Sequence, residues 1–427
     1  MKKTVCELFA GVGGFRVGLN GKDDNNNWDF VFANQWEPGK KNQYAFDCYT
    51  HHFGKSVNHV NEDVGTIDEN SIPNHNLLVG GFPCQDYSVA RTQAQGIQGH
   101  KGVLWWEINR IVKAKRPPFI LLENVDRLLK SPAKQRGRDF GIILYSLCKL
   151  GYAVEWRVIN AAEFGLAQKR RRTFIFAFHN RTKYYAKLSK LDSLDKWILD
   201  NGFFQSEFPS RFLKDNLSIE LNSFNDIVDM SDNFKFDFKN SGIMFNGSIT
   251  SMELKAKEFL PITLRQIRQD EAVDEKYFIH TDTNRLDKFK YLKGSKKIQR
   301  VDKNGYEYFY SEGGMNFPDN LDFPGRTMLT SEGSVNRSTH VIEDAISGNY
   351  RILTPIECER LNGFPDNWTD TGMPENFRYF CMGNALVVGL IEKMGYQLDK
   401  IFKREKDIRI MESDEAAITF NQTTLGI

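Results

Sequence analysis

Long apolar runs, closely paired cysteines and a marked excess of charge of one sign are all missing from this 427-residue sequence. No segment approaches the roughly 18 consecutive apolar residues that a membrane-spanning helix needs, so we expect a protein that does not bind membranes. The sequence contains six cysteines and no CxxC pair, which argues against a zinc site and a disulfide framework. We therefore expect a cytoplasmic protein without a bound metal.

Proline is also scarce, with 13 residues against 33 glycines, while 41% of the residues are hydrophobic and 26% are charged. This balance excludes collagen-like, low-complexity and wholly disordered proteins. The 57 basic and 55 acidic residues leave a formal charge of +2, which neither requires nor excludes a nucleic-acid partner. The chain is longer than most single hydrophobic cores, so we expect one large domain and a second unit.

Short apolar runs alternate with longer mixed segments in the first half of the chain, the rhythm of βαβ units around a parallel sheet. We predict strands at residues 5–9, 30–33, 77–82, 119–122, 154–159 and 174–178. A crossover helix is expected at residues 103–115, where apolar residues recur at helical spacing. An α/β fold follows from this pattern.

The pattern changes after about residue 180, where segments rich in Phe, Asn, Asp and Lys indicate a separate, irregular unit. Within it, Asn304-Gly305 between two strand-like runs predicts a hairpin. A helix is expected to start at Thr354, which is followed by Pro355 and Glu357. An amphipathic stripe over residues 387–401 predicts a helix that returns to the N-terminal sheet, and the polar end of the chain is expected to fray.

Two strand ends offer groups that suit a nucleotide-like ligand. Gly11, Gly13 and Gly14 follow the first strand, where missing side chains let a ligand approach the backbone, although a tight turn without a ligand is about as plausible. Gln35 and Glu37 follow the second strand and could hold a ribose. Trp36 between them could cover an adenine, and a core tryptophan is the alternative.

The third strand ends in GGFPCQDYS, which places Cys84 in a polar turn at the edge where open α/β sheets carry reactive groups. A lone cysteine is usually buried and inert, but this polar turn suits a nucleophile. The Gly-punctuated segment that follows is interpreted as a mobile lid, with surface disorder as the alternative.

The fourth strand leads into Glu123, a carboxyl group after four apolar residues. Desolvation there would raise its pKa and let it donate a proton, whereas a buried structural glutamate is the alternative. Farther along, Arg170, Arg171 and Arg172 directly precede a strand. Because side chains alternate along a strand, one arginine can enter a pocket while its neighbour meets phosphate.

Taken together, a Gly-rich first turn, PCQ, ENV, QKRRR and a late GNA, in this order, resemble the cytosine-5 DNA methyltransferases. The resemblance covers residues 1 to about 180 and about 350 to 402. It implies a Rossmann-like S-adenosylmethionine-dependent methyltransferase domain, discontinuous over residues 1–184 and 346–427. Residues 185–345 would then form a smaller, irregular target recognition domain.

The resemblance also implies roles for individual residues. Cys84 matches the nucleophile that adds to carbon 6 of a flipped-out cytosine, Glu123 the proton donor to ring nitrogen 3, and Arg172, with Arg170, the arginines of the catalytic site. The residues expected to bind the cofactor are Phe9, Gly11, Gly13, Gln35, Trp36, Glu37, Asp63, Val64, Leu104 and Asn384. The family often has an acidic residue where this chain has Gln35, so we expect Glu37 to share the ribose diol.

The expected activity is sequence-specific methylation of double-stranded DNA, with S-adenosylhomocysteine as the second product. We expect a monomeric modification enzyme of a restriction-modification system, and the sequence leaves open whether a cognate endonuclease acts beside it without a stable complex. The tRNA-methylating branch of the family, a catalytically silent DNA-binding regulator and a nicotinamide dehydrogenase are the alternatives.

Overall fold

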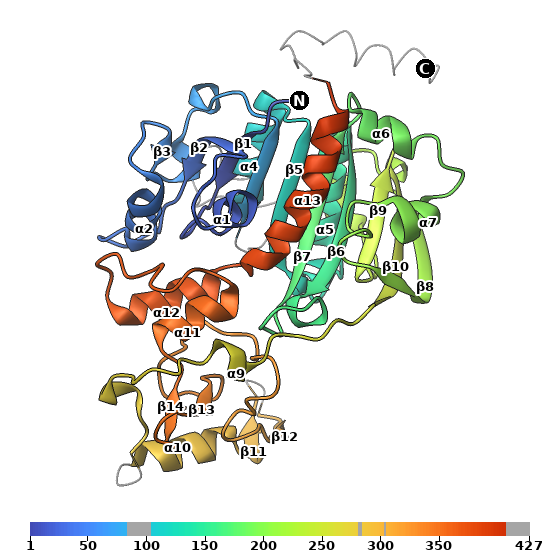
Figure 1. The fold of residues 1–427 in the computed structure, drawn as a ribbon. Helices are drawn as coiled ribbons and strands as arrows, with labels where there is room; N and C mark the ends of the chain where they lie inside the picture. The colour runs from blue at the N-terminus through green and yellow to red at the C-terminus, as the bar shows by residue number, and fades with distance from the viewer. Residues whose placement is uncertain (83–103, 281–283, 303–304, 407–427) are drawn as a thin grey trace, which may run out of the picture.

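A sheet of ten strands in the order β3-β2-β1-β4-β5-β7-β6-β9-β10-β8 runs through the larger unit of the molecule, and a smaller lobe lies below it (Figure 1). The computed structural model describes residues 1–82, 104–280, 284–302 and 305–406. The fold is of the α/β class, as the sequence predicts.

The parallel half of the sheet consists of the first strand of the chain and the strands on either side of it. They are β1 (Thr4–Leu8), β2 (Asp29–Asn34), β3 (His59–Val60), β4 (Leu77–Gly81) and β5 (Phe119–Val125). Each pairs in parallel with its neighbour, so their carboxyl ends share one edge. All but the two-residue β3 were predicted from the apolar runs.

Helices cover both faces of this sheet. The helices α1 (Gly14–Asn20), α2 (Tyr44–Phe53) and α13 (Val388–Arg404) contribute to the core on one face. The helices α4 (Leu104–Lys115) and α5 (Arg138–Lys149) contribute to the core on the other face. Strand β5 serves both cores, because Phe119 and Leu121 point to the first and Ile120 and Leu122 to the second.

The C-terminal helix α13 returns to the N-terminal sheet, as its amphipathic stripe predicts. The ring of Phe402 lies 4.8 Å from that of Trp28 and 5.2 Å from that of Phe119, centroid to centroid. Gly18 of α1 lies where an added Cβ would approach Ile391 to 2.5 Å, so the absence of a side chain lets the two helices pack closely. The chain end therefore completes the N-terminal half of the fold.

The antiparallel half of the sheet includes residues beyond 185, where the sequence predicted a domain boundary. After β6 (Tyr152–Asn160) and β7 (Arg171–His179), the strands β9 (Ser241–Phe245), β10 (Ser248–Ala256) and β8 (Ser210–Glu220) extend the same sheet from β6. Residues 210–256 thus continue the large unit. The sequence from about residue 200 onward gives no regular strand pattern because its phenylalanines do not alternate regularly, yet many of them are core residues: Phe203, Phe204, Phe208, Phe234, Phe236 and Phe238.

The small lobe consists of α9 (Leu264–Ile267), α10 (Asn284–Lys293) and two hairpins, β11 (Lys296–Val301) with β12 (Glu307–Glu312) and β13 (Val341–Glu343) with β14 (Tyr350–Ile352). The β11–β12 pair forms at the predicted hairpin. The small lobe has its own hydrophobic core, which consists of Tyr277, Ile279, Leu286, Phe289, Val341 and Ile352. The helices α11 (Pro355–Asn362) and α12 (Glu375–Asn384) lie between the lobe and the sheet (Figure 1).

Short elements complete the described chain. Thr354 caps α11 in a capping box with Glu357, as the sequence predicts. The remaining short elements are η1 (Val64–Thr66), η2 (Glu69–Ser71), η3 (Asp126–Lys130), η4 (Ala161–Glu163), α6 (Lys183–Leu188), α7 (Leu194–Lys196), η5 (Trp197–Asn201), η6 (Leu221–Ser223), α8 (Ile227–Asn233) and η7 (Glu275–Tyr277). The expected lid and the C-terminal tail lie outside the described residues.

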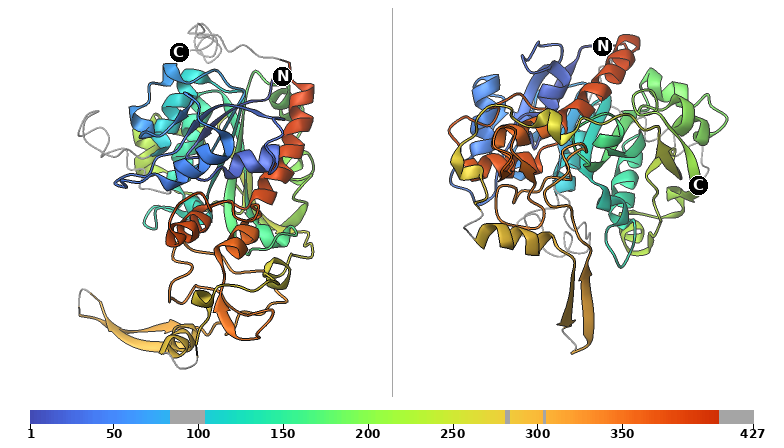
Figure 2. Two further views of the ribbon diagram at one scale, coloured as in Figure 1. Left: turned by 60° about the vertical axis from the view of Figure 1, so that its left-hand side comes forward. Right: turned by 60° about the horizontal axis from the view of Figure 1, so that its bottom comes forward.

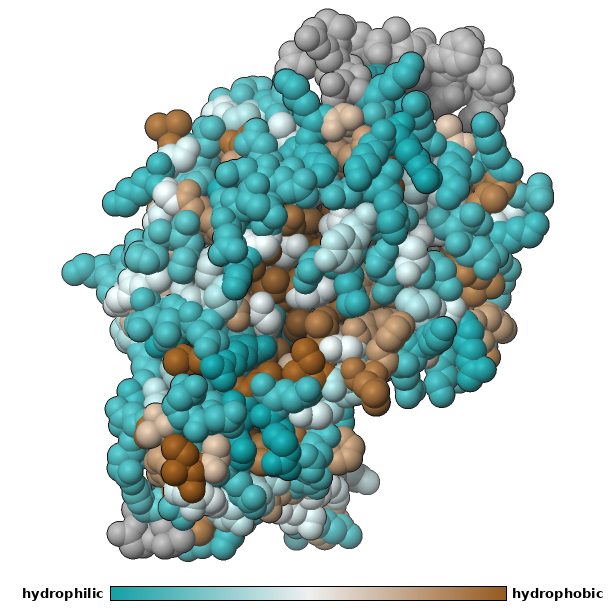
Figure 3. Space-filling view, viewed as in Figure 1, coloured by the Kyte–Doolittle hydropathy of each residue, from teal (hydrophilic) through white to brown (hydrophobic). Residues whose placement is uncertain are grey.

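The surface seen in Figure 3 is largely hydrophilic, and apolar residues gather where the two units meet. The connection between β10 and α9 exposes 96% of Leu260 and 46% of Phe259. Among the described residues, no helix combines the length and apolar character needed to cross a membrane.

Candidate active site

The register of the parallel strands brings the predicted site residues to one edge of the sheet. Leu8 at the end of β1 pairs with Asn34 of β2 and with Gly80 of β4. Gly81, the last residue of β4, pairs with Glu123 of β5. The chain therefore leaves β1, β2 and β4 at the edge of the sheet that also carries Glu123, with β4 next to Glu123 and with β1 and β2 farther along.

Glu123 and Arg172 form an ion pair at this edge. The Nε atom of Arg172 lies 2.9 Å from Oε1 of Glu123, and the two side chains are 15% and 13% exposed. Burial raises the pKa of Glu123, while the positive charges of Arg172 and Arg170 oppose that rise. The carboxyl group is thus held in one orientation in a largely desolvated place, where its neutral form is favoured relative to water.

Asn124 connects Glu123 to the turn that follows β4. Its side chain is buried, and Nδ2 donates to the backbone oxygen of Phe82 at 2.8 Å. Cys84 itself lies outside the described residues. The contact nevertheless anchors the chain two residues before Cys84 to the residue next to Glu123, a role the sequence analysis did not assign to Asn124.

The other five cysteines are poor candidates for a nucleophile. Burial is the main cause that raises the thiol pKa in each of them, which are Cys6, Cys48, Cys148, Cys358 and Cys381. A raised thiol pKa leaves little reactive thiolate near neutral pH. Among the six cysteines, Cys84 is the one whose sequence context still favours nucleophilic chemistry.

Arg170 is placed differently from Arg172. It is 1% exposed, and its guanidinium donates to the backbone oxygens of Met328 at 3.1 Å, Gly383 at 2.9 Å and Asn384 at 3.3 Å. Burial lowers its pKa to about 9, and nearby Arg172 adds to this effect. These contacts indicate that Arg170 positions the backbone of residues 383–385, the late GNA sequence. The resemblance implied a catalytic role for Arg170 instead.

The side chain of Arg171 points away from those of Arg170 and Arg172. Its side chain is 55% exposed, with Nε 3.3 Å from Oδ2 of Asp126. The alternation expected for a strand therefore holds, because Arg170 and Arg172 face the interior while Arg171 faces solvent.

Gln168 links the large unit to the small lobe. It is fully buried, donates to Oδ1 of Asn362 at 2.9 Å and accepts the backbone N–H of Met328 at 3.1 Å. Asn362 in turn donates to the backbone oxygen of Met382. Together with Arg170, these contacts hold the segment after Gly325 against the edge of the sheet.

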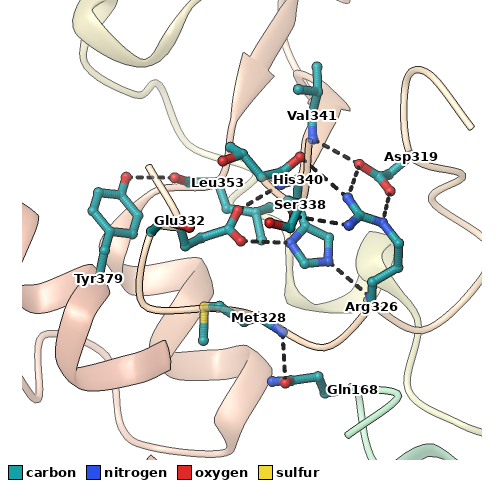
Figure 4. A network of polar contacts seen from close by, with 12 residues as sticks. Gln168, Asp319, Arg326, Met328, Glu332, Ser338, His340, Val341, Leu353 and Tyr379 are labelled. Carbon is teal, nitrogen blue, oxygen red and sulfur yellow. Dashed lines mark hydrogen bonds and ion pairs between the residues drawn. The ribbon is translucent and has the colours of Figure 1, made fainter. Parts of the chain in front are cut away.

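A buried network fixes the same segment from the side of the lobe (Figure 4). Asp319 accepts from Nε of Arg326 at 2.8 Å and from the backbone N–H of Val341 at 2.9 Å. His340 accepts the backbone N–H of Arg326 at Nε2, 2.9 Å away, and its Nδ1 lies 3.2 Å from Glu332. Since a backbone N–H can only donate, the ring proton of the neutral His340 must be on Nδ1, facing Glu332.

The glycine turn after β1 is strongly shaped. Phe9, Gly11 and Gly13 all have positive φ, at 56°, 57° and 89°. An added Cβ on Gly13 would lie 2.4 Å from Phe53, whereas Gly11 has open space. The backbone N–H of Gly11 donates to Oε1 of Gln35 at 2.8 Å, which joins the ends of β1 and β2.

Trp36 and Glu37 are both half-buried. The ring of Trp36 stacks on no other ring among the described residues. Burial raises the pKa of Glu37, and a hydrogen bond from the backbone of Ala45 opposes the rise. Oε2 of Glu37 is buried and has no hydrogen-bond partner among the described residues, so it could accept from a ligand hydroxyl.

The remaining predicted cofactor residues surround the same edge. Asp63 caps η1 by accepting the backbone N–H of Gly65, and Asn34 donates to the backbone oxygen of Glu62 beside it. Val64 is buried, Leu104 begins α4, and Asn384 ends α12. Among these residues, the contact of Asn34 with Glu62 connects the segment of Asp63 to the end of β2.

Glu7 of β1 is a buried acid that was not predicted as a site residue from the sequence. Its Oε2 accepts from the hydroxyl of Tyr49 at 3.0 Å, while Oε1 is buried and has no hydrogen-bond partner in the part of the chain that the structure describes. Burial raises its pKa from an ordinary value of 4.5 to about 8. A charged residue inside an apolar strand, two residues before Phe9, was the available signal.

We expect the free energy of unfolding to show this burial. Glu7 stabilises the fold below pH 4.5, and this contribution is lost as pH rises toward about 8, because only the folded state holds the proton there. Replacing Glu7 by Gln should remove roughly 2 to 3 kcal/mol of the pH dependence between about pH 5 and pH 7. Urea unfolding of both proteins at the two pH values measures it, and identical pH dependence would contradict the prediction.

Comparison with known proteins gives a consistent result. The family model of C-5 cytosine-specific DNA methylase matches residues 3–400. The type II methyltransferase M.Sau3AI of Staphylococcus aureus is 52% identical over 94% of this chain and 96% of its own length. M.HhaI of Haemophilus parahaemolyticus is 24% identical over 92% of this chain and 93% of its own.

A likeness of fold alone is found with the crystal structure of S. pombe Dnmt2 methyltransferase, at a TM-score of 0.57 and 16% identity, covering 94% of this chain and 99% of that one. The family match extends over nearly the whole chain. The chain belongs to the family of C-5 cytosine-specific DNA methylases.

Proposed function

We propose that this enzyme methylates carbon 5 of one cytosine within a specific sequence of double-stranded DNA, as the modification enzyme of a type II restriction-modification system. Its membership of the methylase family and its similarity to a type II methyltransferase support the proposal. The observation that supports this chemistry is the ion pair between Glu123 and Arg172. Glu123 pairs in the sheet with Gly81, which lies three residues before Cys84 in the sequence.

In the proposed reaction the Cys84 thiolate adds to carbon 6 of the flipped-out cytosine. Glu123 donates a proton to ring nitrogen 3, so electrons from the carbon 5–carbon 6 double bond move toward carbon 5 as the carbon–sulfur bond forms. Arg172 holds Glu123 and faces the base carbonyl. When carbon 5 takes the methyl group, the double bond between carbon 4 and nitrogen 3 forms again and the nitrogen 3 proton returns to Glu123. Loss of the carbon 5 proton to water then restores the carbon 5–carbon 6 double bond and expels the thiolate.

Arg170 acts in this scheme as a positioning residue. Its three bonds to backbone oxygens connect the segment around Met328 with the end of α12. An arginine used in this way has few donors left for a base. We therefore propose that Arg172 contacts the cytosine and that Arg170 keeps the surrounding backbone in place.

The chain's residues fit a bound S-adenosylmethionine. Three features lie on segments that leave the neighbouring strands β1 and β2: the open space at Gly11, the ring of Trp36 and Oε2 of Glu37. Within the described ranges, the Trp36 ring has no stacking partner and Oε2 of Glu37 has no hydrogen-bond partner. When bound, S-adenosylmethionine supplies an electrophilic methyl group. Gly11 would allow close approach at the backbone, Trp36 would cover the adenine, and Gln35 and Glu37 would hold the ribose diol.

Cofactor titrations test the division between the last two residues. Oε1 of Gln35 already accepts from Gly11, which leaves its amide nitrogen for a hydroxyl, whereas Glu37 offers a charged acceptor. Loss of a charged hydrogen bond costs roughly 1.5 to 3 kcal/mol and of a neutral one about 0.5 to 1.5. Glu37→Ala should therefore weaken cofactor binding more than Gln35→Ala. A clearly larger loss of cofactor affinity for Gln35→Ala would mean that Glu37 does not hold the ribose and only contacts the backbone of Ala45 in α2.

The function itself is tested by methyl transfer from tritiated cofactor to duplex DNA and to tRNA. We expect label in DNA alone, and bisulfite sequencing of a plasmid treated with the enzyme should place it at one cytosine of a short repeated sequence. Transfer to tRNA alone would favour the tRNA-methylating alternative. Binding of DNA without transfer to either substrate would favour a silent regulator.

A further inference from the structure

The segment between β3 and β4 carries Asp63 and Val64, two of the residues expected to bind the cofactor. β3 has only two residues, and the chain continues from it through the short helices η1 and η2, which lie outside the sheet. Pairing with β2 ends at Val60, three residues before Asp63. Contacts made by side chains must therefore hold the rest of this segment in place.

On the side of β2, two amide side chains hold the start of the segment. Nδ2 of Asn34 donates to the backbone oxygen of Glu62 at 2.9 Å. Nδ2 of Asn61 donates to the backbone oxygen of Gln35 at 2.7 Å. The segment thus lies beside the chain that leads into Trp36, whose ring is expected to cover the adenine.

On the side of α4, Arg110 holds the rest of the segment. Its Nη2 donates to the backbone oxygen of Val64 at 3.1 Å, and its Nη1 forms an ion pair with Glu69. Its Nε donates to Oε2 of Glu107, one turn earlier in α4, at 2.9 Å. All three nitrogens of the guanidinium are therefore used, and they connect η1, η2 and α4.

The charge of Arg110 also keeps neighbouring carboxylates together. A Cβ added to Gly65 would lie 3.4 Å from Oδ1 of Asp63 and 3.7 Å from the carboxyl carbon of Glu107, so these two acids approach the same point. The side chains of Arg110 and Glu107 are partly buried, so solvent screens their attraction only in part. Without the guanidinium, Asp63 and Glu107 would repel each other across Gly65.

Asp63 offers a carboxylate to the cofactor in a fixed orientation. Its Oδ1 accepts the backbone N–H of Gly65 at 3.0 Å, which sets the direction of the side chain at the start of η1. Its Oδ2 can then accept from an amino group such as that of adenine. A hydrogen bond tolerates only a few tenths of an ångström in donor–acceptor distance, so this contact depends on where the turn is held.

We infer that Arg110 is a positioning residue for the cofactor, because it sets the place of the turn at Asp63 and Val64 that meets the amino edge of the adenine. Asn34 holds the same turn from β2, so the turn is fixed between the sheet and α4. The inference rests on the proposed function, in which S-adenosylmethionine is the methyl donor. The sequence assigned no role to Arg110, which lies within the predicted crossover helix.

Competition binding with the full enzyme tests the inference. The two competitors are S-adenosylhomocysteine and its analogue in which hypoxanthine replaces adenine, so that the amino group is absent. We expect the wild type to prefer the adenine compound by about 10- to 150-fold, the range for a hydrogen bond to a charged group. In Arg110→Ala this preference should fall to a few-fold, while affinity for the hypoxanthine analogue should hardly change.

Kinetics gives a second readout. Arg110→Ala should raise the KM for S-adenosylmethionine and leave kcat at saturating cofactor within a few-fold of the wild type. The reason is that Glu123 and Arg172 lie on β5 and β7, separated from β3 by β2, β1 and β4 in the sheet. Arg110→Lys keeps the charge without the planar fork, so it should recover only part of the preference for adenine.

Lys113→Ala is the matched control, because Lys113 is an exposed cation of the same helix, and it should behave as the wild type. Duplex binding provides a control on the fold of Arg110→Ala. Figure 2 shows the small lobe, which belongs to the segment expected to recognise DNA, at the opposite end of the molecule from the N-terminal strands. Duplex affinity should therefore equal that of the wild type.

Three results would overturn the inference. An unchanged preference for adenine in Arg110→Ala would mean that the turn keeps its place without the guanidinium. Equal losses of affinity for both competitors would show a general effect on the cofactor pocket. If Arg110→Ala does not fold, Glu69→Gln weakens one of the three contacts, and an unchanged preference in that variant would have the same meaning. A wild type that binds neither competitor would instead refute the proposed cofactor, before any variant is compared.

Discussion

Replacement of Cys84 by alanine is expected to reduce methyl transfer below detection while leaving duplex binding within a few-fold of the wild type. The substitution removes the sulfur that must bond to carbon 6, and no other described cysteine has an activated thiol, since burial raises the pKa of each. Binding depends mainly on phosphate contacts, which the substitution does not touch. Tritium transfer and gel-shift titration measure the two quantities.

Cys148→Ala provides the matched control. Cys148 is half-buried in α5, away from the strand ends, so its removal should leave both quantities unchanged. Turnover by Cys84→Ala within a few-fold of the wild type would refute the covalent mechanism.

Glu123→Gln is expected to slow the chemical step by roughly 10²- to 10⁴-fold, the usual contribution of a positioned acid or base. The amide keeps the shape of the side chain and a hydrogen-bond acceptor for Nε of Arg172, but it is a very weak proton donor. Cofactor affinity should hardly change, because Glu123 lies beyond the segments expected to hold the cofactor. Single-turnover kinetics with saturating cofactor isolates this step.

The pH profile gives a second readout. Burial raises the pKa of Glu123, so its protonated form persists to higher pH than in water, and the rate should fall as pH rises through that pKa. This fall should be absent in Glu123→Gln. Glu392→Gln, on the exposed side of α13, should keep the wild-type profile. A chemical rate unchanged in Glu123→Gln would exclude Glu123 as the proton donor.

The order of short apolar runs was enough to predict six strands, a crossover helix, the capped start of α11 and the return of α13. These features depend on local patterns, because a strand buried on both faces must be apolar and a helix that packs on one side must be amphipathic. The direction of pairing is not local, and the predicted parallel sheet is wrong for β6 and β7, which are antiparallel. The chemistry-bearing residues were also visible in the sequence, since Cys84 and Glu123 come after predicted strands and Arg172 comes just before one, at the start of the antiparallel β7. Parallel strands place such residues at one edge whatever the rest of the fold does.

The extension of the sheet by β9, β10 and β8 could not be predicted in the same way. The strands β9 and β10 form a local hairpin across Asn246 and Gly247, whose positive φ values suit a tight turn, so this pair had a signal in the sequence. The attachment of β9 to β6 and the pairing of β8 with β10 join segments farther apart in sequence, and such pairing is decided by which edge is free in the folded molecule. The phenylalanine-rich segments therefore look irregular in sequence and become core only when α5 and the extended sheet enclose them.

The sequence by itself determined the family, the fold class and the identity of Cys84, Glu123 and Arg172 as the candidate catalytic residues. Only the tertiary structure distinguished Arg170 from Arg172, two arginines in the same short run. One meets three backbone oxygens from Met328 and α12, and the other meets Glu123. The difference arises because the partners of each side chain come from segments more than 150 residues away in one case and from the adjoining strand in the other. A local pattern encodes which residues face inward, whereas the packed chain decides what they meet there.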